Sequence, residues 1–196
     1  MSDANEQLEF VKHADEATHK NRDIALLIAI LALCLALSEM LGKGANTEAL
    51  TLTVKAADTW NFYQAKTIRR TVLTTAVEEL KLSAQTAADA QRPGIDKQIA
   101  DWQATAARYQ SEPDGKGGGE GTRELMQRAK DDEAARDTAL ARYHNFEIAS
   151  ATFQVGIVLC SAAVITGMMV LAWIAGGLAV VGVVFVALGL LAPHFL

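Results

Sequence analysis

The sequence predicts an all-α protein in which three transmembrane helices carry an extramembrane antiparallel helical hairpin, or stalk. Hydrophobic residues make up 51% of the 196 residues and charged residues 21%. The charges are segregated, because residues 148–196 contain none of the 18 Lys and Arg or the 23 Asp and Glu residues. A second apolar run lies near the N-terminus, and helix-forming residues fill the region between the two runs. This pattern excludes a secreted disulfide scaffold, a fibrous repeat and a disordered chain.

The first predicted transmembrane helix covers residues 24–41 and follows a polar N-terminal tail, residues 1–23. A bilayer core about 30 Å thick needs roughly 20 apolar helical residues, and this run has no charge before Glu39. Gly42-Lys43-Gly44 follows it. A cleaved signal peptide is the alternative. It is disfavoured because a long, acid-rich tail precedes the run and no A-x-A site stands close behind it.

The C-terminal apolar region predicts two further spans that form a tight transmembrane hairpin. Its 49 residues, Ile148 to Leu196, would extend about 74 Å as one helix, more than twice the thickness of the bilayer core. The region must therefore fold back. Gly167 is the best break near its midpoint, which gives transmembrane helices over residues 148–167 and 171–191.

Between the first and second spans, residues 42–147 form the predicted extramembrane helical domain. Residues 46–91 contain no Gly or Pro and predict one long helix, which ends at Arg92-Pro93-Gly94. An amphipathic helix follows, with Ile95, Ile99, Trp102, Ala106 and Tyr109 on one face. We expect this face to pack against apolar residues in the distal half of the long helix, namely Ile68, Val72, Leu73, Ala76, Val77 and Leu80.

Residues 111–121 predict a flexible, glycine-rich loop within this domain, because five of the eleven residues are glycine. A phosphate-binding loop is the alternative, but the motif spacings and the preceding strand are missing. A last polar helix starts near Thr122 and leads into the second span. One side of it carries Leu125, Ala129, Arg136, Ala139 and Tyr143, and Asp131-Asp132-Glu133 interrupts it. The returning helices nearly match the outgoing one in length, which predicts the antiparallel hairpin.

Three spans place the two termini on opposite sides of the membrane. Long domains count little in the positive-inside rule, so the orientation rests on the N-terminal tail, where Lys12, Lys20 and Arg22 favour a cytoplasmic N-terminus. The middle domain would then be periplasmic. Cys34 and Cys160 fall inside the predicted spans, where cysteine most often acts as a small packing residue, so they do not decide the orientation.

Two stretches of the chain resemble a known family. The segment A-D-T-W-N-F-Y-Q-A-K at residues 57–66, preceded by A-N-T-E-A-L at 45–50, is similar to the hallmark segment of domain-of-unknown-function family 4337, which comprises uncharacterised bacterial membrane proteins. F-Q-V-G-I-V-L at residues 153–159, with Leu171-Ala172-Trp173, is similar to that family's terminal hairpin. The resemblance implies a multi-pass protein of the bacterial inner membrane and supplies no activity. Gly167-Met168-Met169 departs from the basic hairpin turn that family members commonly carry.

The sequence predicts no enzyme, no catalytic residue, no cofactor and no metal site. The histidines are His13, His19, His144 and His194, and no G-x-S-x-G motif or catalytic-cysteine context accompanies them. Pairs at i,i+4 in the tail, Glu9 with His13 and Asp15 with His19, offer metal binding as an alternative. Ordinary solvated charges explain such pairs more simply.

Glu39 is the candidate intramembrane acid, because ionisable groups within spans usually face a bundle interior or water. The simpler interpretation, which its terminal position favours, is that Glu39 reaches the interface or pairs with Lys43. Glu147, at the start of the second span, has the same two interpretations.

Small residues and aromatic residues indicate contacts between helices. Gly156 with Cys160, Ala163 with Gly167, and Ala172 with Gly176 are spaced for close helix packing, within one copy or between copies. Trp60, Phe62 and Tyr63 form the candidate interaction surface. Positions 60 and 62 lie about 200° apart on a helix, so one of these side chains should contact a second subunit or, alternatively, a partner-protein groove.

These patterns favour a non-enzymatic structural or interaction component that self-associates. Its expected partners are the lipid bilayer and further copies of the chain, with another membrane protein as an alternative and no nucleic acid. Passage of ions or small solutes through an oligomer is the alternative function. It draws on Glu39 and on a third span rich in glycine, but that span offers no polar lining residues.

Overall fold

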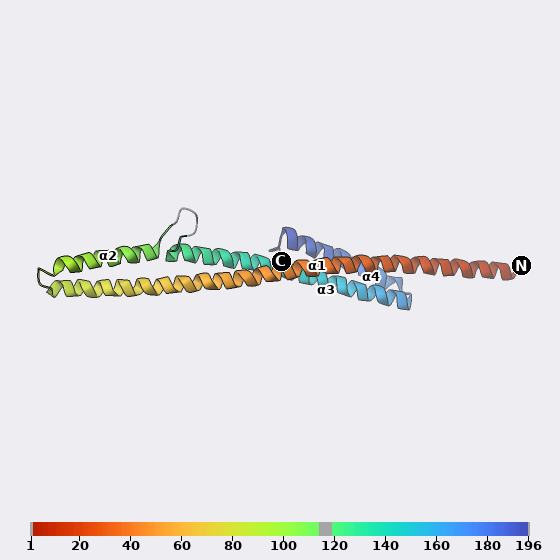
Figure 1. Ribbon diagram of the computed structural model, residues 1–196. Coiled ribbons are helices and arrows are strands. Elements are labelled where there is room, and N and C mark those ends of the chain that lie inside the picture. The colour runs from red at the N-terminus through yellow and green to blue at the C-terminus, as the bar shows by residue number, and fades with distance from the viewer. Residues whose placement is uncertain (1, 114–118, 196) are drawn as a thin grey trace. The chain divides into compact units, whose positions relative to one another are not determined.

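The computed structural model describes residues 2–113 and 119–195, with side chains from residue 22 onward. Four helices make up the chain in this range: α1 (Ser2–Thr86), α2 (Arg92–Gln110), α3 (Thr122–Thr166) and α4 (Met169–Leu191) (Figure 1). The described residues contain no strand, so the predicted all-α class is confirmed. The helices α1, α3 and α4 each contain a segment long and apolar enough to cross a membrane, which indicates a membrane protein.

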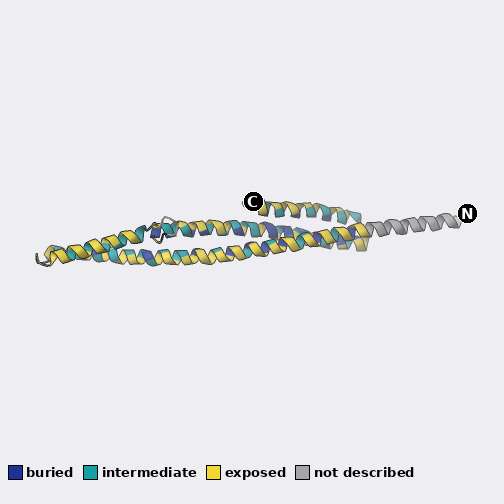
Figure 2. Ribbon diagram, turned by 45° about the horizontal axis from the view of Figure 1, so that its top comes forward, coloured by how far each residue is buried: buried dark blue, intermediate teal, exposed yellow. Residues whose placement is uncertain are grey.

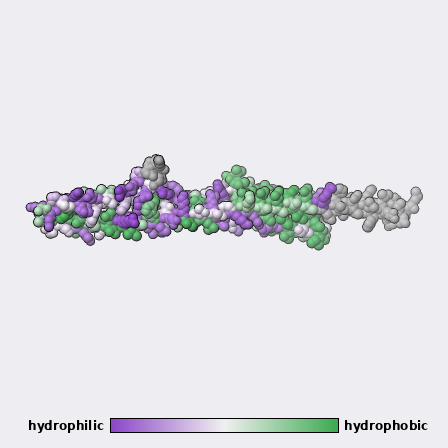
Figure 3. All heavy atoms as spheres, viewed as in Figure 1, coloured by the Kyte–Doolittle hydropathy of each residue, from purple (hydrophilic) through white to green (hydrophobic). Residues whose placement is uncertain are grey.

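The helices form two compact units. Unit 1 contains residues 1–48 and 138–196, and unit 2 contains residues 49–137. The apolar segments of α1 and α3 and the whole of α4 fall in unit 1, where Figure 3 shows hydrophobic side chains gathered over the surface. Both α1 and α3 contribute residues to both units.

In unit 1, four buried residues of α1 recur every seven positions, and from Phe146 onward the buried residues of α3 follow alternating steps of three and four. This spacing keeps one face of each helix on its neighbour. The buried positions on α4 are all small residues at seven-residue intervals. The buried residues are Ile24, Leu31, Ser38, Gly42 and Ala45 on α1; Ala139, Asn145, Phe146, Ala149, Phe153, Gly156, Cys160 and Ala163 on α3; and Ala175, Gly182 and Gly189 on α4.

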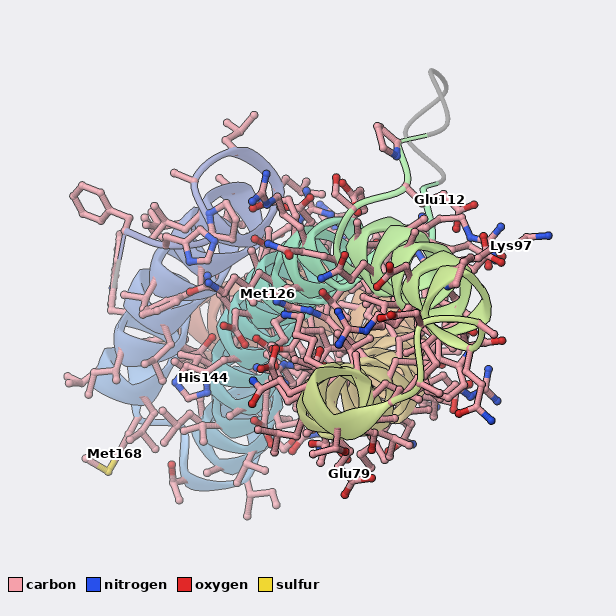
Figure 4. All side chains as sticks on the ribbon, turned by 90° about the vertical axis from the view of Figure 1, so that its left-hand side faces the viewer. Glu79, Lys97, Glu112, Met126, His144 and Met168 are labelled. Carbon is pink, nitrogen blue, oxygen red and sulfur yellow. The ribbon has the colours of Figure 1, made fainter. Side chains whose placement is uncertain are left out.

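The turn between α3 and α4 lies at the glycine that the sequence predicts as the break. The N–H of Gly167 donates to the carbonyl of Ala163 at 2.9 Å, and Gly167 has a φ of 70°. A residue with a side chain rarely adopts that backbone conformation, so glycine suits this C-terminal helix end. Met168 follows, with its side chain 56% exposed and pointing away from the helices (Figure 4).

The first apolar span and the long helix that the sequence predicts after it are one helix, α1, without a break at Gly42-Lys43-Gly44. Glycine in a helix interior costs about 1 kcal/mol relative to alanine, so this continuity needs a compensating contact. Gly42 is buried, and a Cβ placed on it would lie 3.5 Å from the Cβ of Phe146. Packing against α3 therefore outweighs the local propensity.

In unit 2, α1 ends at Thr86 and α2 begins at Arg92, so Pro93 and Gly94 lie in the first turn of α2 rather than after the end of α1. Proline is well tolerated there because the first N–H groups of a helix have no intrahelical partner. The predicted face of α2 is the protected one. All five of its residues are half-buried: Ile95, Ile99, Trp102, Ala106 and Tyr109.

The predicted partner face on α1 is only partly right. Val77 is buried, and Leu73, Ala76 and Leu80 are half-buried as expected. Ile68 and Val72, in contrast, are 64% and 61% exposed, so their assignment to the core is wrong. Ile68 precedes Val77 by nine residues, which at 100° per residue places it on the opposite side of the helix.

The part of α3 in unit 2 buries Leu125 and Ala129, as predicted. Asp132, which the sequence suggested as an interruption, is instead a buried member of the same face. Its Oδ1 accepts from Lys55 Nζ at 2.8 Å. Figure 2 shows how buried and exposed residues alternate along these helices.

Candidate functional site

The predicted aromatic surface of α1 is divided between two environments. Trp60 Nε1 donates to Glu133 Oε1 on α3 at 2.9 Å, and the Trp60 ring meets the Tyr63 ring edge-to-face at 5.4 Å between centroids. Both residues are half-buried within unit 2. Phe62 is 39% exposed. Trp60 and Tyr63 therefore stabilise packing within unit 2, and Phe62 retains an open surface.

A buried lysine on α1 contacts α2 and both ends of the connector between α2 and α3. Lys66 is only 5% exposed, and its ammonium group lies 5.1 Å from the Phe62 ring centroid and 5.7 Å from that of Tyr109. It also lies 3.4 Å from a carboxylate oxygen of Glu120 and 3.9 Å from one of Glu112. Rings and carboxylates together offset the cost of removing the charge from water. The sequence interpretation missed this residue, although Lys66 shares a helix face with Leu73 and Val77.

Glu124, in the first turn of α3, links the two ends of the glycine-rich connector. Its Oε1 accepts from Ser111 Oγ at 2.6 Å, and its Oε2 accepts from the backbone N–H of Glu112 at 3.3 Å. Arg128 Nη2 donates to the carbonyl of Gly119 at 3.1 Å. The ends of the predicted flexible loop are thus tied down, while its middle, residues 114–118, lies outside the described residues.

The hydrogen bond from Ser111 lowers the pKa of Glu124, aided by the backbone N–H groups of Glu124 and Glu112. A carboxylate whose pKa is lowered by folding stabilises the folded state above its ordinary pKa of 4.5, and this contribution is lost as the pH falls through the folded value.

We expect Glu124→Gln to lower the melting temperature of the protein at pH 7, because a neutral amide accepts these hydrogen bonds less strongly. The difference from the wild type should shrink as the pH is lowered below the ordinary carboxyl pKa, since the wild-type side chain then becomes neutral too. Thermal unfolding of both proteins between neutral and acidic pH measures this difference. The contributions of the other carboxylates to the pH dependence are the same in both proteins and cancel in the comparison. A pH-independent difference would contradict the assignment.

Glu39 is exposed, and it lies beside a cavity of about 300 Å³ between α1 and α3. In the part of the chain that the structure describes, no ion pair joins Glu39 to Lys43. The hydroxyl of Ser38 is buried and has no hydrogen-bond partner there. The cavity brings two carboxylates, Glu39 and Glu147, near one lysine and two serines. Its lining residues are Ser38, Glu39, Gly42, Lys43, Tyr143, Phe146, Glu147 and Ser150.

The small residues singled out from the sequence occupy different places in unit 1. Gly156, Cys160 and Ala163 are buried on α3, and a Cβ on Gly156 would lie 3.3 Å from Leu31 Cδ1 on α1. Gly167 forms the turn and is exposed. Ala172 and Gly176 are half-buried.

Sequence reasoning missed the two glycines with the closest contacts between helices. Gly182 lies against Phe153 and Gly189 against Phe146, so that a Cβ on either would meet a ring carbon at 2.5 Å and 2.8 Å respectively. Together with Ala175 they form a row of small residues at seven-residue intervals, and this spacing in the sequence could have indicated their role in helix packing.

Among the described residues, no group of three or more His, Cys, Asp or Glu side chains gathers in a metal-binding arrangement. The side chains of Glu9, His13, Asp15 and His19 lie outside the described residues. His194 Nε2 lies 2.9 Å from Thr138 Oγ1, and His144 Nδ1 lies 3.9 Å from Glu147 Oε2.

Comparison with known proteins gives one match. No curated protein and no solved structure matches the chain. The model of a family described as "Domain of unknown function (DUF4337)" matches residues 20–192, which include the apolar segments of α1, α3 and α4. Because this match covers most of the sequence, the chain belongs to the DUF4337 family, whose function is unknown.

Proposed function

We propose that the protein is a non-enzymatic membrane scaffold that self-associates and presents unit 2 as an extramembrane stalk. The observation that carries the proposal is the contrast between the surfaces of the two units. Unit 1 exposes many large apolar side chains, a surface that water would penalise and lipid would not. Examples on the three apolar helices are Leu26 (62%), Leu33 (62%), Val158 (66%) and Trp173 (79%).

The contacts of unit 2 favour an extramembrane position and an antiparallel hairpin. Lys55 pairs with Asp132 on α3, and Lys66, further along α1, pairs with Glu120, which lies just before the start of α3. As the position along α1 increases, the position of its partner decreases, which is the order expected of antiparallel helices. In Figure 1, α2 and the start of α3 both run beside α1. Exposed charged side chains such as Glu79 and Lys97 point away from the helices, as expected in water (Figure 4).

We place the protein in the bacterial inner membrane, with a cytoplasmic N-terminus and a periplasmic unit 2. Three spans put the termini on opposite sides, and the basic residues Lys12, Lys20 and Arg22 favour the cytoplasm for the tail. The proposed partners are the lipid bilayer and further copies of the chain, and another membrane protein is the alternative partner.

Passage of ions or small solutes through an oligomer is the alternative function. The cavity that Glu39 and Glu147 line is the observation in its favour. An ion current across proteoliposomes that Glu39→Gln changes would support this alternative over a scaffold.

Cysteine labelling and mass measurement test the proposal. In a chain with Cys34→Ala and Cys160→Ala, we expect Lys97→Cys to react with a membrane-impermeant reagent in spheroplasts. Lys20→Cys should stay protected until the membrane is permeabilised, because the two positions lie on opposite sides. The inverse pattern would place unit 2 in the cytoplasm. The detergent-corrected mass of the unlabelled protein should be at least twice the 21.0 kDa of one chain, and a monomeric mass would contradict self-association.

A further inference from the structure

Of the six large apolar side chains that the described part of unit 2 exposes, four lie on one face of α1, and the other two are Phe62 and Leu82. Leu50, Val54, Ile68 and Val72 are 61–64% exposed. This surface belongs to the unit that we place in water, so lipid does not cover it. Contiguous apolar surface in water marks a site of association.

These residues form a single continuous stripe. Successive members are separated by four, three, four, four, three and four positions, which confines them to about 80° of the helix circumference at 100° per residue. The buried Val77 lies on the opposite side of the helix, whereas Ala65, at one edge of the stripe, is half-buried. We call this set the outer stripe: Leu50, Val54, Ala57, Asn61, Ala65, Ile68 and Val72.

We propose that the outer stripe pairs with the outer stripe of a second copy of the chain, in parallel and in register. This inference rests on the proposed function, because it names the surface through which the scaffold associates. It adds a surface distinct from Trp60 and Tyr63, whose rings are engaged within unit 2.

The spacing of the stripe favours another helix with the same spacing as its partner. Its six steps amount to two repeats of eleven residues, and a period of 11/3 residues per turn is close to that of a straight helix. Two such stripes therefore stay in contact over their whole length with little supercoiling. No member is charged, so self-pairing brings no like charges together.

Asn61 at the centre of the stripe favours one register. In register, its amide faces the amide of Asn61 in the second copy, and the two can exchange hydrogen bonds. A shifted register places the amide against apolar side chains and leaves it without a partner, which is costly. A single polar residue in an otherwise apolar seam is a known means of fixing register.

Insertion of all copies with the same topology favours the parallel direction of pairing. The steps of the stripe read the same in both directions from Asn61, so spacing alone allows antiparallel pairing. Copies inserted with one topology present the residues that follow the first span from the same side of the membrane, and this favours parallel pairing. In a parallel pair opposite flanks meet. One flank carries Asp58 and Arg69, and the other carries the uncharged Thr53, Gln64 and Thr71, so like charges again stay apart.

Disulfide cross-linking in proteoliposomes tests the pairing. In the chain lacking Cys34 and Cys160, Val54→Cys and Ile68→Cys should each give covalent dimers on mild oxidation. Thr74→Cys is the matched control, because Thr74 is exposed on α1 but lies outside the stripe. We expect roughly tenfold more dimer at positions 54 and 68 than at 74, since a disulfide requires Cα atoms within about 7 Å.

The outcomes separate this inference from the proposed function. An oligomeric mass without cross-linking above the Thr74→Cys control would overturn the pairing and leave the scaffold in place. A disulfide formed only between Val54→Cys and Ile68→Cys chains when they are mixed would show antiparallel pairing, and it would overturn the inference too. A monomeric mass would overturn both. As a second readout, Val54→Glu with Ile68→Glu should lower the oligomeric mass at unchanged helicity, whereas Thr74→Glu should not.

Discussion

Phe153→Ala is expected to destabilise unit 1 by about 3–5 kcal/mol, the usual cost of removing a fully buried aromatic side chain from a packed core. Phe153 on α3 is 1% exposed and is among the largest fully buried side chains described. Its ring occupies the space that Gly182 leaves on α4, so its removal leaves a cavity between the two helices. The loss of these packing contacts strongly affects stability in a membrane, because packing rather than exclusion of water holds apolar helices together there.

Val158→Ala provides the control for this substitution. Val158 lies on the same helix but is 66% exposed, so its truncation should leave the packing unchanged. Denaturant titrations of both variants in detergent micelles, followed by circular dichroism, measure the difference. Equal losses would show that α3 does not pack on α4 through Phe153.

Much of the fold could be predicted because the decisive signals are local. The uncharged C-terminal region is too long for one span, and its break falls at Gly167, where a positive φ is required. The face of α2 from Ile95 to Tyr109 is also correct, because helical periodicity alone identifies it. Family membership followed from short segments such as residues 57–66, which lie within the matched range.

The errors arose where one helix offers two plausible faces. In its polar half, α1 carries apolar residues on both sides, so the sequence could not show whether Ile68 or Val77 faces α2. Likewise, the glycines at 42 and 44 predict a helix break if judged by propensity. The contact of Gly42 with Phe146, more than a hundred residues away, could not be read from the local sequence.

For the aromatic surface of α1, too, contacts between residues distant in sequence could not be predicted. The aromatic residues were visible in the sequence, but their partners were not. Trp60 reaches Glu133, and Lys66 lies between Phe62 and Tyr109, a ring from another helix. Both contacts depend on the pairing of segments distant in sequence, and the sequence interpretation did not assign Lys66 or Glu133 to the interior of unit 2. Phe62, with 39% exposure, keeps the property expected of an interaction residue.

Gly182→Ala should destabilise unit 1 by about 1–3 kcal/mol, the usual cost of overfilling a packed core. Its new methyl group would lie 2.5 Å from Phe153 Cε1 and 2.7 Å from Thr152 Oγ1. Because Phe153 is fully buried, its ring has no free space to move into, so α4 must shift away from α3. Denaturant titration in micelles measures the loss.

Gly177→Ala is the matched control, since Gly177 lies on the same helix and a Cβ there meets nothing within 4 Å. This variant should be neutral or slightly stabilising, because alanine has the higher helix propensity. A double-mutant cycle makes the test specific: once Phe153→Ala has removed the ring, the additional loss from Gly182→Ala should largely disappear, because the methyl group then fills part of the cavity. Additive losses would mean that the glycine is needed for some reason other than the approach of Phe153 to α4.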